Sequence, residues 1–263
     1  MHTLQLSDGV LSLIDARLYS DNVYDGCARV VVHVADAFWL LLDTPPHDRQ
    51  DIAAAWYGFQ CDRGLDVHTA DGGVCITKSD DALDVWIAHS DAVHSPQIFC
   101  GATEPVAGWV SPRYGERVAA PQLRFDVPAD AMAAAFLVSL HADYAQARIV
   151  RHLQQNDGAH LVVLETRDGE EWLVYQPVKC KAWQLHDATL SFDGVLLWMR
   201  FGSSGLAELR WLGGTALSLP AYAVDIVLRG DKPADLAIGP QTTADEIAPS
   251  CARLQWPFCH RRD

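Results

Sequence analysis

The sequence has 263 residues, of which 49% are hydrophobic and 21% are charged, and its formal net charge is −14. This composition predicts a soluble globular protein with a sizeable core and excludes a disordered chain. The acidic charge repels nucleic acids and anionic membrane surfaces, and no apolar run is long enough to cross a bilayer as a helix. We therefore expect neither nucleic acid nor a membrane as a partner.

Short apolar runs separated by turn residues extend along the whole chain. In residues 83–88, Leu83, Val85 and Ile87 alternate with side chains that would face the other way, which is typical of a strand. The runs predicted as strands are residues 28–35, 38–43, 74–77, 83–88, 134–141, 147–153, 160–167, 171–176, 188–192, 196–201, 207–212 and 222–228. Val, Leu, Trp and Tyr dominate them, as a pleated, half-buried surface favours.

Asp-Gly steps, which favour tight hairpin turns, separate many of these runs. They begin at Asp8, Asp25, Asp71, Asp157, Asp168 and Asp193. Residues 143–155 can be interpreted as a helix or a strand, and we favour a strand that pairs with residues 160–167 through Asp157-Gly158. Residues 128–135 would form one or two helical turns. The fold class expected is all-β: a large antiparallel multi-sheet β-sandwich of stacked sheets with few short helices, forming a single domain over residues 1–263.

The cysteines are odd in number and irregularly spaced, and no C-x-x-C pair occurs. They are Cys27, Cys61, Cys75, Cys100, Cys180, Cys251 and Cys259. This pattern argues against a disulfide framework or a zinc ribbon. A Cys251–Cys259 pair is conceivable, but free thiols are the preferred interpretation.

Residues 108–123, GWVSPRYGERVAAPQL, are the most informative stretch of the chain. Gly and Pro shape its backbone, while Trp, Tyr and Arg supply stacking faces and hydrogen-bond donors, which is the chemistry that a sugar-binding loop needs. The predicted substrate-binding residues are Trp109, Arg113, Tyr114 and Arg117. Tyr114 could act as a base or as a stacking platform, and Arg113 could hold a carboxylate with two hydrogen bonds. The alternative is a structural loop whose Tyr packs on the sheet.

Other candidates give weaker signals. Trp56 and Tyr57 could stack on sugars, but a chain with nine Trp must use most of them in its core or at its rim. His89, Asp91 and His94 cluster possible metal ligands in one loop, yet a zinc site needs a further protein ligand that the sequence does not identify. We therefore predict no metal and no cofactor.

Three segments together resemble the C-terminal β-domain of heparinase II/III-type polysaccharide lyases. Residues 108–123 follow the pattern G-W-x-S-x-x-Y-G, with a later P-x-L. In residues 19–43, four positions fall on the family's hairpin pattern, namely Tyr24, Arg29, Trp39 and Asp43. Residues 192–214 resemble the closing strands. The likeness covers most of the chain, and the order and spacing of the segments carry it.

The resemblance implies a role in the binding or processing of uronate-containing polysaccharides, which the family cleaves by β-elimination. In the family, the catalytic residues come mostly from a helical toroid and from a His-x-His-x-Asp stretch. This sequence contains neither, and we assign no metal ligand to His2. No catalytic residue is therefore predicted. An anionic glycan would need a local basic patch on this acidic chain, for which Arg113, Arg117 and Arg124 are the densest candidates.

The function expected is a heparinase II/III-like, carbohydrate-associated accessory module, for example in exopolysaccharide handling, that is not catalytic alone. Its partners would be a polysaccharide or oligosaccharide and a separate helical catalytic chain. One alternative is a polysaccharide lyase, or a subunit or fragment of one, and another is a structural, dimerising sandwich. The sequence shows no signal peptide, so the cytoplasm is the default location, with the periplasm or cell envelope expected if the chain is part of an exported lyase.

Overall fold

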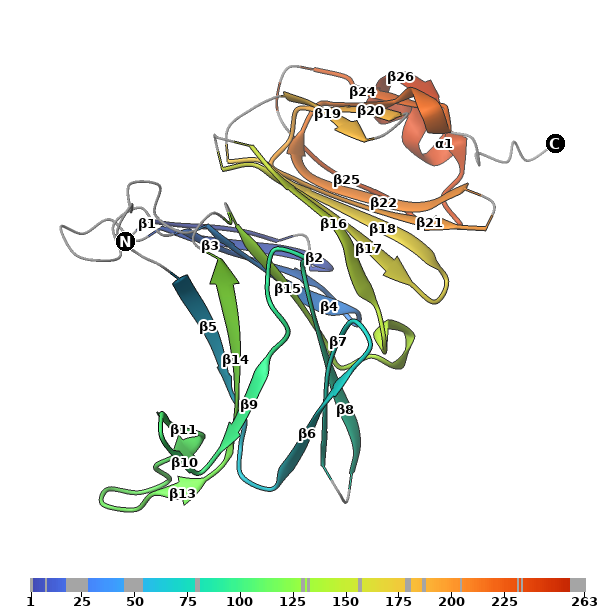
Figure 1. The fold of residues 1–263 in the computed structure, drawn as a ribbon. Coiled ribbons are helices and arrows are strands. Elements are labelled where there is room, and N and C mark those ends of the chain that lie inside the picture. Colours follow the sequence, from blue (N-terminus) through green and yellow to red (C-terminus); the bar gives the residue numbers. More distant parts are fainter. Residues whose placement is uncertain are drawn as a thin grey trace. The chain divides into compact units, whose positions relative to one another are not determined.

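The structure is a computed structural model that describes residues 2–7, 9–17, 28–44, 54–78, 81–128, 131, 133–155, 158–177, 181–185, 188–203, 205–230, 232 and 234–255. Strands make up most of these residues (Figure 1). The helical segments described are short: η1 (Ala142–Tyr144), η2 (Pro220–Tyr222), α1 (Ala244–Ile247) and η3 (Ala248–Ser250). The predicted fold class, an all-β protein with several antiparallel sheets, is confirmed.

The chain divides into two compact units, which are described separately. Unit 1 comprises Met1–Leu4 and Ile14–Val150, and unit 2 comprises Gln5–Leu13 and Arg151–Asp263. The expectation of a single domain over residues 1–263 stays a prediction. No helix among the described residues is long and apolar enough to span a membrane.

The eight-stranded sheet has the order β1-β2-β3-β4-β15-β8-β7-β6, and its strands β3, β4, β15, β8, β7 and β6 belong entirely to unit 1. In this order, the strands are β1 (His2–Ser7), β2 (Leu11–Arg17), β3 (Ala28–Val34), β4 (Phe38–Thr44), β15 (Ala134–Ser139), β8 (Asp81–His89), β7 (Gly73–Lys78) and β6 (Leu65–Ala70). The β6–β7 hairpin turns at Asp71-Gly72, as predicted, because Ala70 pairs with Gly73 and Gly72 takes a φ of 83°.

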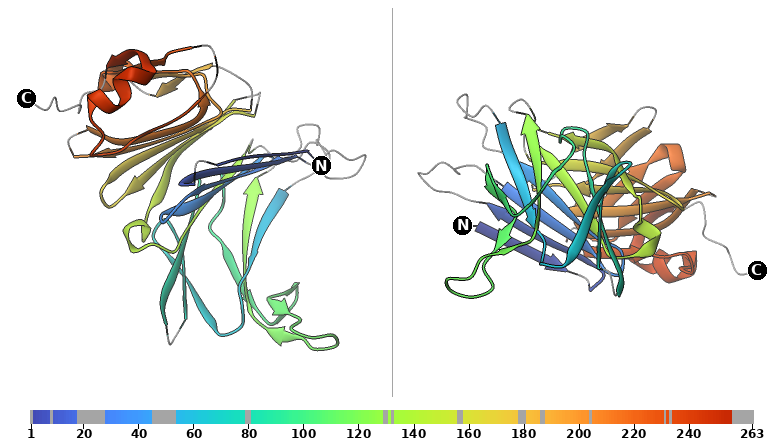
Figure 2. Two further views of the ribbon diagram at one scale, coloured as in Figure 1. Left: turned by 180° about the vertical axis from the view of Figure 1, so that it is seen from behind. Right: turned by 60° about the horizontal axis from the view of Figure 1, so that its bottom comes forward.

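A three-stranded sheet, here called the small sheet, covers one face of the eight-stranded sheet (Figures 1 and 2). Its order is β5 (Ala54–Gln60), β14 (Pro121–Pro128) and β9 (Gln97–Cys100). The core between the two sheets includes Phe125 and Phe136, whose rings meet edge to face with centroids 5.1 Å apart. Both side chains are almost fully buried. Such burial of large aromatic side chains supplies most of the stability of a sandwich.

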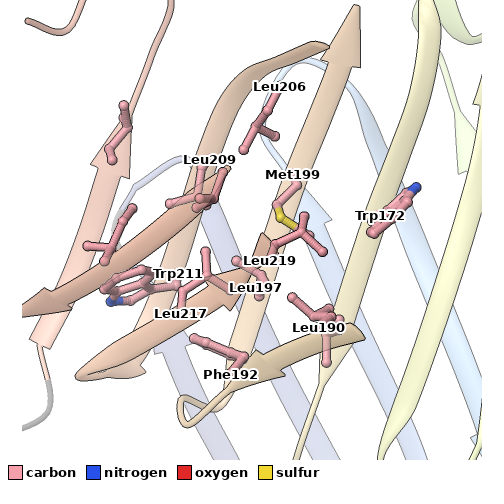
Figure 3. Packing of buried hydrophobic residues seen from close by; sticks show 14 of the residues in the cluster. Trp172, Leu190, Phe192, Leu197, Met199, Leu206, Leu209, Trp211, Leu217 and Leu219 are labelled. Carbon is pink, nitrogen blue, oxygen red and sulfur yellow. The ribbon is translucent and has the colours of Figure 1, made fainter. Parts of the chain in front are cut away.

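Unit 2 is a second sandwich, made of a six-stranded and a five-stranded sheet. The six-stranded sheet has the order β16 (Arg148–Gln154), β17 (His160–Thr166), β18 (Gly169–Tyr175), β21 (Leu196–Gly202), β22 (Gly205–Gly214) and β25 (Ala234–Ile238). The other has the order β19 (Lys181–Leu185), β20 (Ala188–Phe192), β23 (Ala216–Leu219), β24 (Val224–Leu228) and β26 (Cys251–Gln255). Figure 3 shows the core between them, where Trp211, Met199 and Phe192 interdigitate with leucines from both sheets.

Two local predictions need correction. The helix expected at residues 128–135 is wrong where the structure describes it, because Pro128 ends β14 and Ala134 begins β15. Pairing of Ala134 with Asp43 overrides the helix propensity of the alanines. Asp193-Gly194 is not a hairpin turn, since it joins β20 of one sheet to β21 of the other. The strand expected within residues 143–155 is confirmed as β16, although it starts only at Arg148.

None of the described cysteines forms a disulfide. These are Cys61, Cys75, Cys100 and Cys251. The other three, Cys27, Cys180 and Cys259, lie outside the described residues, so the Cys251–Cys259 alternative does too. Among the Asp-Gly steps, Asp8, Asp157 and the whole Asp25-Gly26 step also lie outside them.

Candidate functional site

The four predicted substrate-binding residues all lie on one segment of unit 1, residues 101–120, here called the ribbon segment. It connects β9 to β14 and contains two short antiparallel pairs (Figure 1). The first pair is β10 (Ala102–Thr103) with β11 (Val106–Ala107), and the second is β12 (Trp109–Val110) with β13 (Val118–Ala119).

Gly108 fixes the ribbon segment to the small sheet. Its amide donates to Oε1 of Gln122 at 2.9 Å, and its carbonyl accepts from the amides of Gly101 at 2.8 Å and Ala120 at 3.0 Å. Its φ is 73°, and a Cβ atom here would lie 2.6 Å from the carbonyl of Phe99. Only glycine fits this position, because any other residue meets both backbone strain and a backbone clash.

Trp109 and Arg117 contact each other inside the ribbon segment. The guanidinium carbon of Arg117 lies 3.8 Å from the centroid of the Trp109 ring, which is a close cation–π contact. The indole Nε1 of Trp109 donates to the carbonyl of Ala102 at 2.8 Å. A sugar could stack on this face of the indole only by displacing Arg117, so the geometry favours a structural part for both residues.

Arg113 and Tyr114 lie in the exposed turn between β12 and β13. The carbonyl of Arg113 accepts from Ser111 Oγ at 2.9 Å and from the amide of Glu116 at 3.0 Å, which closes the turn. Tyr114 is fully exposed, and within the described part of the chain its side chain makes no hydrogen bond or ring–ring contact. The structure thus leaves the side chains of Arg113 and Tyr114 available to a ligand.

The small sheet carries a second exposed surface, here called the sheet face, next to the ribbon segment. Its residues occupy alternate positions on the three strands, and cross-strand pairing places them on one side: Trp56, Gly58, Gln60, Gln97, Phe99, Gln122, Arg124 and Asp126. The intervening residues of β14, Leu123, Phe125 and Val127, face the core. This alternation is the period-two pattern of a sheet with one buried side.

Trp56 is the more exposed of the two aromatic side chains of the sheet face, with 54% of its surface accessible, whereas Phe99 is partly buried. Its ring lies over Gly58, since a Cβ atom on that glycine would be 2.8 Å from Cζ3 of the indole. The guanidinium of Arg124 lies 5.5 Å from the ring centroid and its Nε donates to Oδ1 of Asp126 at 2.8 Å. Trp56 therefore lies beside a charge-balanced pair.

Two glutamines join the sheet face to the ribbon segment. Gln60 and Gln122 pair directly across β5 and β14. Nε2 of Gln60 donates to the carbonyls of Cys61 at 3.1 Å and Pro121 at 3.0 Å, whereas Oε1 of Gln122 accepts from Gly108. Both amides are therefore held in defined orientations.

The structure separates the neighbours Trp56 and Tyr57. Tyr57 faces inward, and its ring meets Phe136 edge to face with centroids 5.4 Å apart. Tyr57 therefore packs at the rim of the core, which was the alternative to sugar stacking, whereas Trp56 is exposed.

In the described residues of unit 1, the loop that carries His89, Asp91 and His94 has no further ligand that would complete a metal site. His89 contacts the Ser90 carbonyl at 3.2 Å and the ring of Phe125, and the His94 backbone amide donates to the Asp126 carbonyl. In the part of the chain that the structure describes, no group of three His, Cys, Asp or Glu side chains could hold a metal ion.

Sequence reasoning missed a histidine pair in unit 2. Nε2 of His152 lies 3.0 Å from Nδ1 of His160, and the two rings stack with centroids 5.3 Å apart. Burial lowers the pKa of His152 to about 4 and that of His160 to about 3, the latter also through His152. Both rings are therefore neutral near pH 7. The sequence did contain a signal for this pair, because the two histidines lie on two runs that are predicted to pair as strands.

No protein-family model matches this sequence, and no curated protein matches it. The observations that bear on function are therefore the geometry of the ribbon segment and of the sheet face.

Proposed function

We propose that this protein is a carbohydrate-associated accessory module, resembling the β-domain of heparinase II/III-type lyases, that binds a polysaccharide without cleaving it alone. The observation that carries the proposal is the exposed pair Arg113–Tyr114, presented on a turn that Gly108 anchors to the small sheet. An all-β frame with an exposed, firmly based loop is a common way to position binding residues.

The chemistry of this turn suits a uronate-containing glycan. The ring of Tyr114 can stack on the apolar face of a pyranose, and the guanidinium of Arg113 can hold a carboxylate with two hydrogen bonds. Because the whole chain carries a net charge of −14, such a glycan would depend on this local cation and would bind less tightly at high salt.

A separate helical chain that supplies catalytic residues is the proposed protein partner. The support for it is the resemblance, in which the matching segments belong to the β-domain and the catalytic residues belong to a helical region. In this arrangement the present chain would hold the glycan while the partner cuts it.

Isothermal titration with hexa-mannuronate tests the proposal. We expect the intact chain to bind with a Kd in the millimolar range or tighter, and Arg113→Ala or Tyr114→Ala to weaken binding about tenfold each. Val106→Ala is the matched control, because Val106 is another well-exposed side chain of the ribbon segment and should not affect affinity. No binding at millimolar ligand to acidic or neutral oligosaccharides would refute the proposal.

A further inference from the structure

We infer that the sheet face is a second carbohydrate site, which takes at least two neutral pyranose units, with Trp56 as its stacking platform. This inference rests on the proposed function but concerns a different surface from the Arg113–Tyr114 turn.

The shape and exposure of Trp56 support stacking. The indole leaves more than half of its surface to solvent while it lies over Gly58, where no side chain lifts it from the sheet. A flat aromatic ring lying on a sheet offers a broad apolar surface to the axial C–H groups of a pyranose.

The charges of the sheet face favour a neutral sugar over a uronate. Arg124 provides the positive charge and is already paired with Asp126, and the remaining polar side chains on this face are the amides of Gln60, Gln97 and Gln122. A carboxylate ligand would have to compete with Asp126 for the guanidinium, whereas a neutral hydroxyl can join the pair without displacing it.

Gln60 and Gln122 present complementary groups to sugar hydroxyls. Because Nε2 of Gln60 is used by backbone carbonyls, its Oε1 is left as an acceptor; because Oε1 of Gln122 is used by Gly108, its Nε2 is left as a donor. Within the described residues neither of these two atoms has another partner. A hydroxyl group both donates and accepts, so a fixed acceptor beside a fixed donor matches it.

The length of the sheet face sets the ligand length. Asp126 and Gln122 are four residues apart on β14, which corresponds to about 13 Å along an extended strand. One pyranose ring stacked on the indole cannot contact Asp126 and the glutamine pair at the same time, so a ligand that uses the whole face is at least a disaccharide.

A protein surface is a poorer fit to the sheet face. Trp56 is its one large hydrophobic side chain with high exposure, whereas a stable protein interface buries roughly 800 Å² on each partner around an apolar centre.

The inference is tested by titrating the full chain with four neutral hexasaccharides and with glucose as the monosaccharide. The hexasaccharides are cellohexaose, mannohexaose, laminarihexaose and xylohexaose. We expect at least one neutral hexasaccharide to bind and glucose to bind far more weakly. Trp56→Ala should weaken binding about tenfold or more. Trp39→Ala is the matched control, because Trp39 is a partly exposed tryptophan on another sheet of the same unit and should leave the affinity unchanged.

The substitution Gly58→Ala tests whether sugar affinity can be lost without a loss of protein stability. The added methyl would push the exposed indole of Trp56 off the sheet, while the backbone φ of Gly58 is not in the left-handed region, so stability should be kept or raised. We expect a loss of affinity with an unchanged or higher Tm.

The outcomes distinguish this inference from the proposed function. Neutral binding that is insensitive to Trp56→Ala and Gly58→Ala would overturn the inference, as would the absence of any neutral binding. If hexa-mannuronate alone binds, and does so through Arg113 and Tyr114, then the proposed function stands and the inference fails. If no sugar binds, both fail.

Discussion

Arg29 and Asp43 form a two-point ion pair across the β3–β4 hairpin of unit 1. Nε of Arg29 lies 2.6 Å from Oδ1 of Asp43, and Nη2 lies 2.7 Å from Oδ2. The residues are direct cross-strand partners, and the carboxylate is buried whereas the guanidinium is half exposed. Hydrogen bonding of the Arg29 guanidinium to the Asp43 carboxylate, which accepts, is the main cause that raises the pKa of Arg29.

Removing the arginine should destabilise unit 1 because it leaves a buried carboxylate without its partner. We expect Arg29→Ala to lower the free energy of unfolding by about 2 kcal/mol, and Arg29→Lys, which keeps the charge but loses the two-point geometry, to lower it by about half as much. Urea denaturation followed by circular dichroism measures both. Equal stability of Arg29→Ala and the unmodified protein would show that the pair contributes nothing.

The histidine pair of unit 2 should make stability depend on pH. The folded-state pKa values of His152 and His160 are lowered to about 4 and about 3 from 6.5, so the unfolded chain binds protons that the folded chain does not. Their contribution is fully present above pH 6.5 and is lost as the pH falls from 6.5 toward 3. For His160 alone, the loss at pH 4 is about 3 kcal/mol.

Comparison with the double variant His152→Gln, His160→Gln separates the loss of stability caused by histidine protonation from the loss caused by protonation of carboxylates. We expect the variant to show a shallower fall in unfolding free energy between pH 6.5 and pH 4 than the unmodified protein. Parallel curves over this range would contradict the assignment of neutral, buried rings.

Gly108 should be the critical residue for the placement of the ribbon segment. Gly108→Ala combines a left-handed φ of 73° with a clash against the Phe99 carbonyl, and we expect a loss of about 3 kcal/mol together with faster hydrogen exchange in residues 101–120. Gly115→Ala is the matched control, because Gly115 has a φ of 77° but open space at the Cβ position. It should cost only about 1 kcal/mol. Equal effects of the two substitutions would show that the clash is unimportant.

Much of the fold followed from local sequence, but the connections between sheets did not. The Asp71-Gly72 step forms the predicted hairpin because both flanking strands belong to one sheet. Asp193 instead accepts hydrogen bonds from the amides of Thr215 at 2.7 Å and Ala216 at 2.8 Å, which holds the crossing from β20 to β21. These partners are more than twenty residues away, so a pattern of neighbouring residues cannot reveal them.

The candidate site was predictable to the level of the segment but not of each side chain. The composition of residues 108–123 indicated an exposed loop, and Tyr114 is exposed. The contact of Arg117 with Trp109 depends on the β12–β13 pairing, which short runs do not predict. Period-two alternation shows that Trp56 and Tyr57 face opposite sides, but Phe136 on a distant strand decides which of them is inside.

Nuclear magnetic resonance can map the glycan-binding surface residue by residue and so tests whether the Arg113–Tyr114 turn binds the ligand. Backbone amide signals of the isotopically labelled full chain are recorded while hexa-mannuronate is added. We predict ligand-dependent shifts centred on Arg113, Tyr114 and their neighbours in the ribbon segment, with the signals of the unit 2 core unchanged. Saturable shifts confined to unit 2, or no shift in residues 101–120 at millimolar ligand, would show that the Arg113–Tyr114 turn is not the glycan-binding surface.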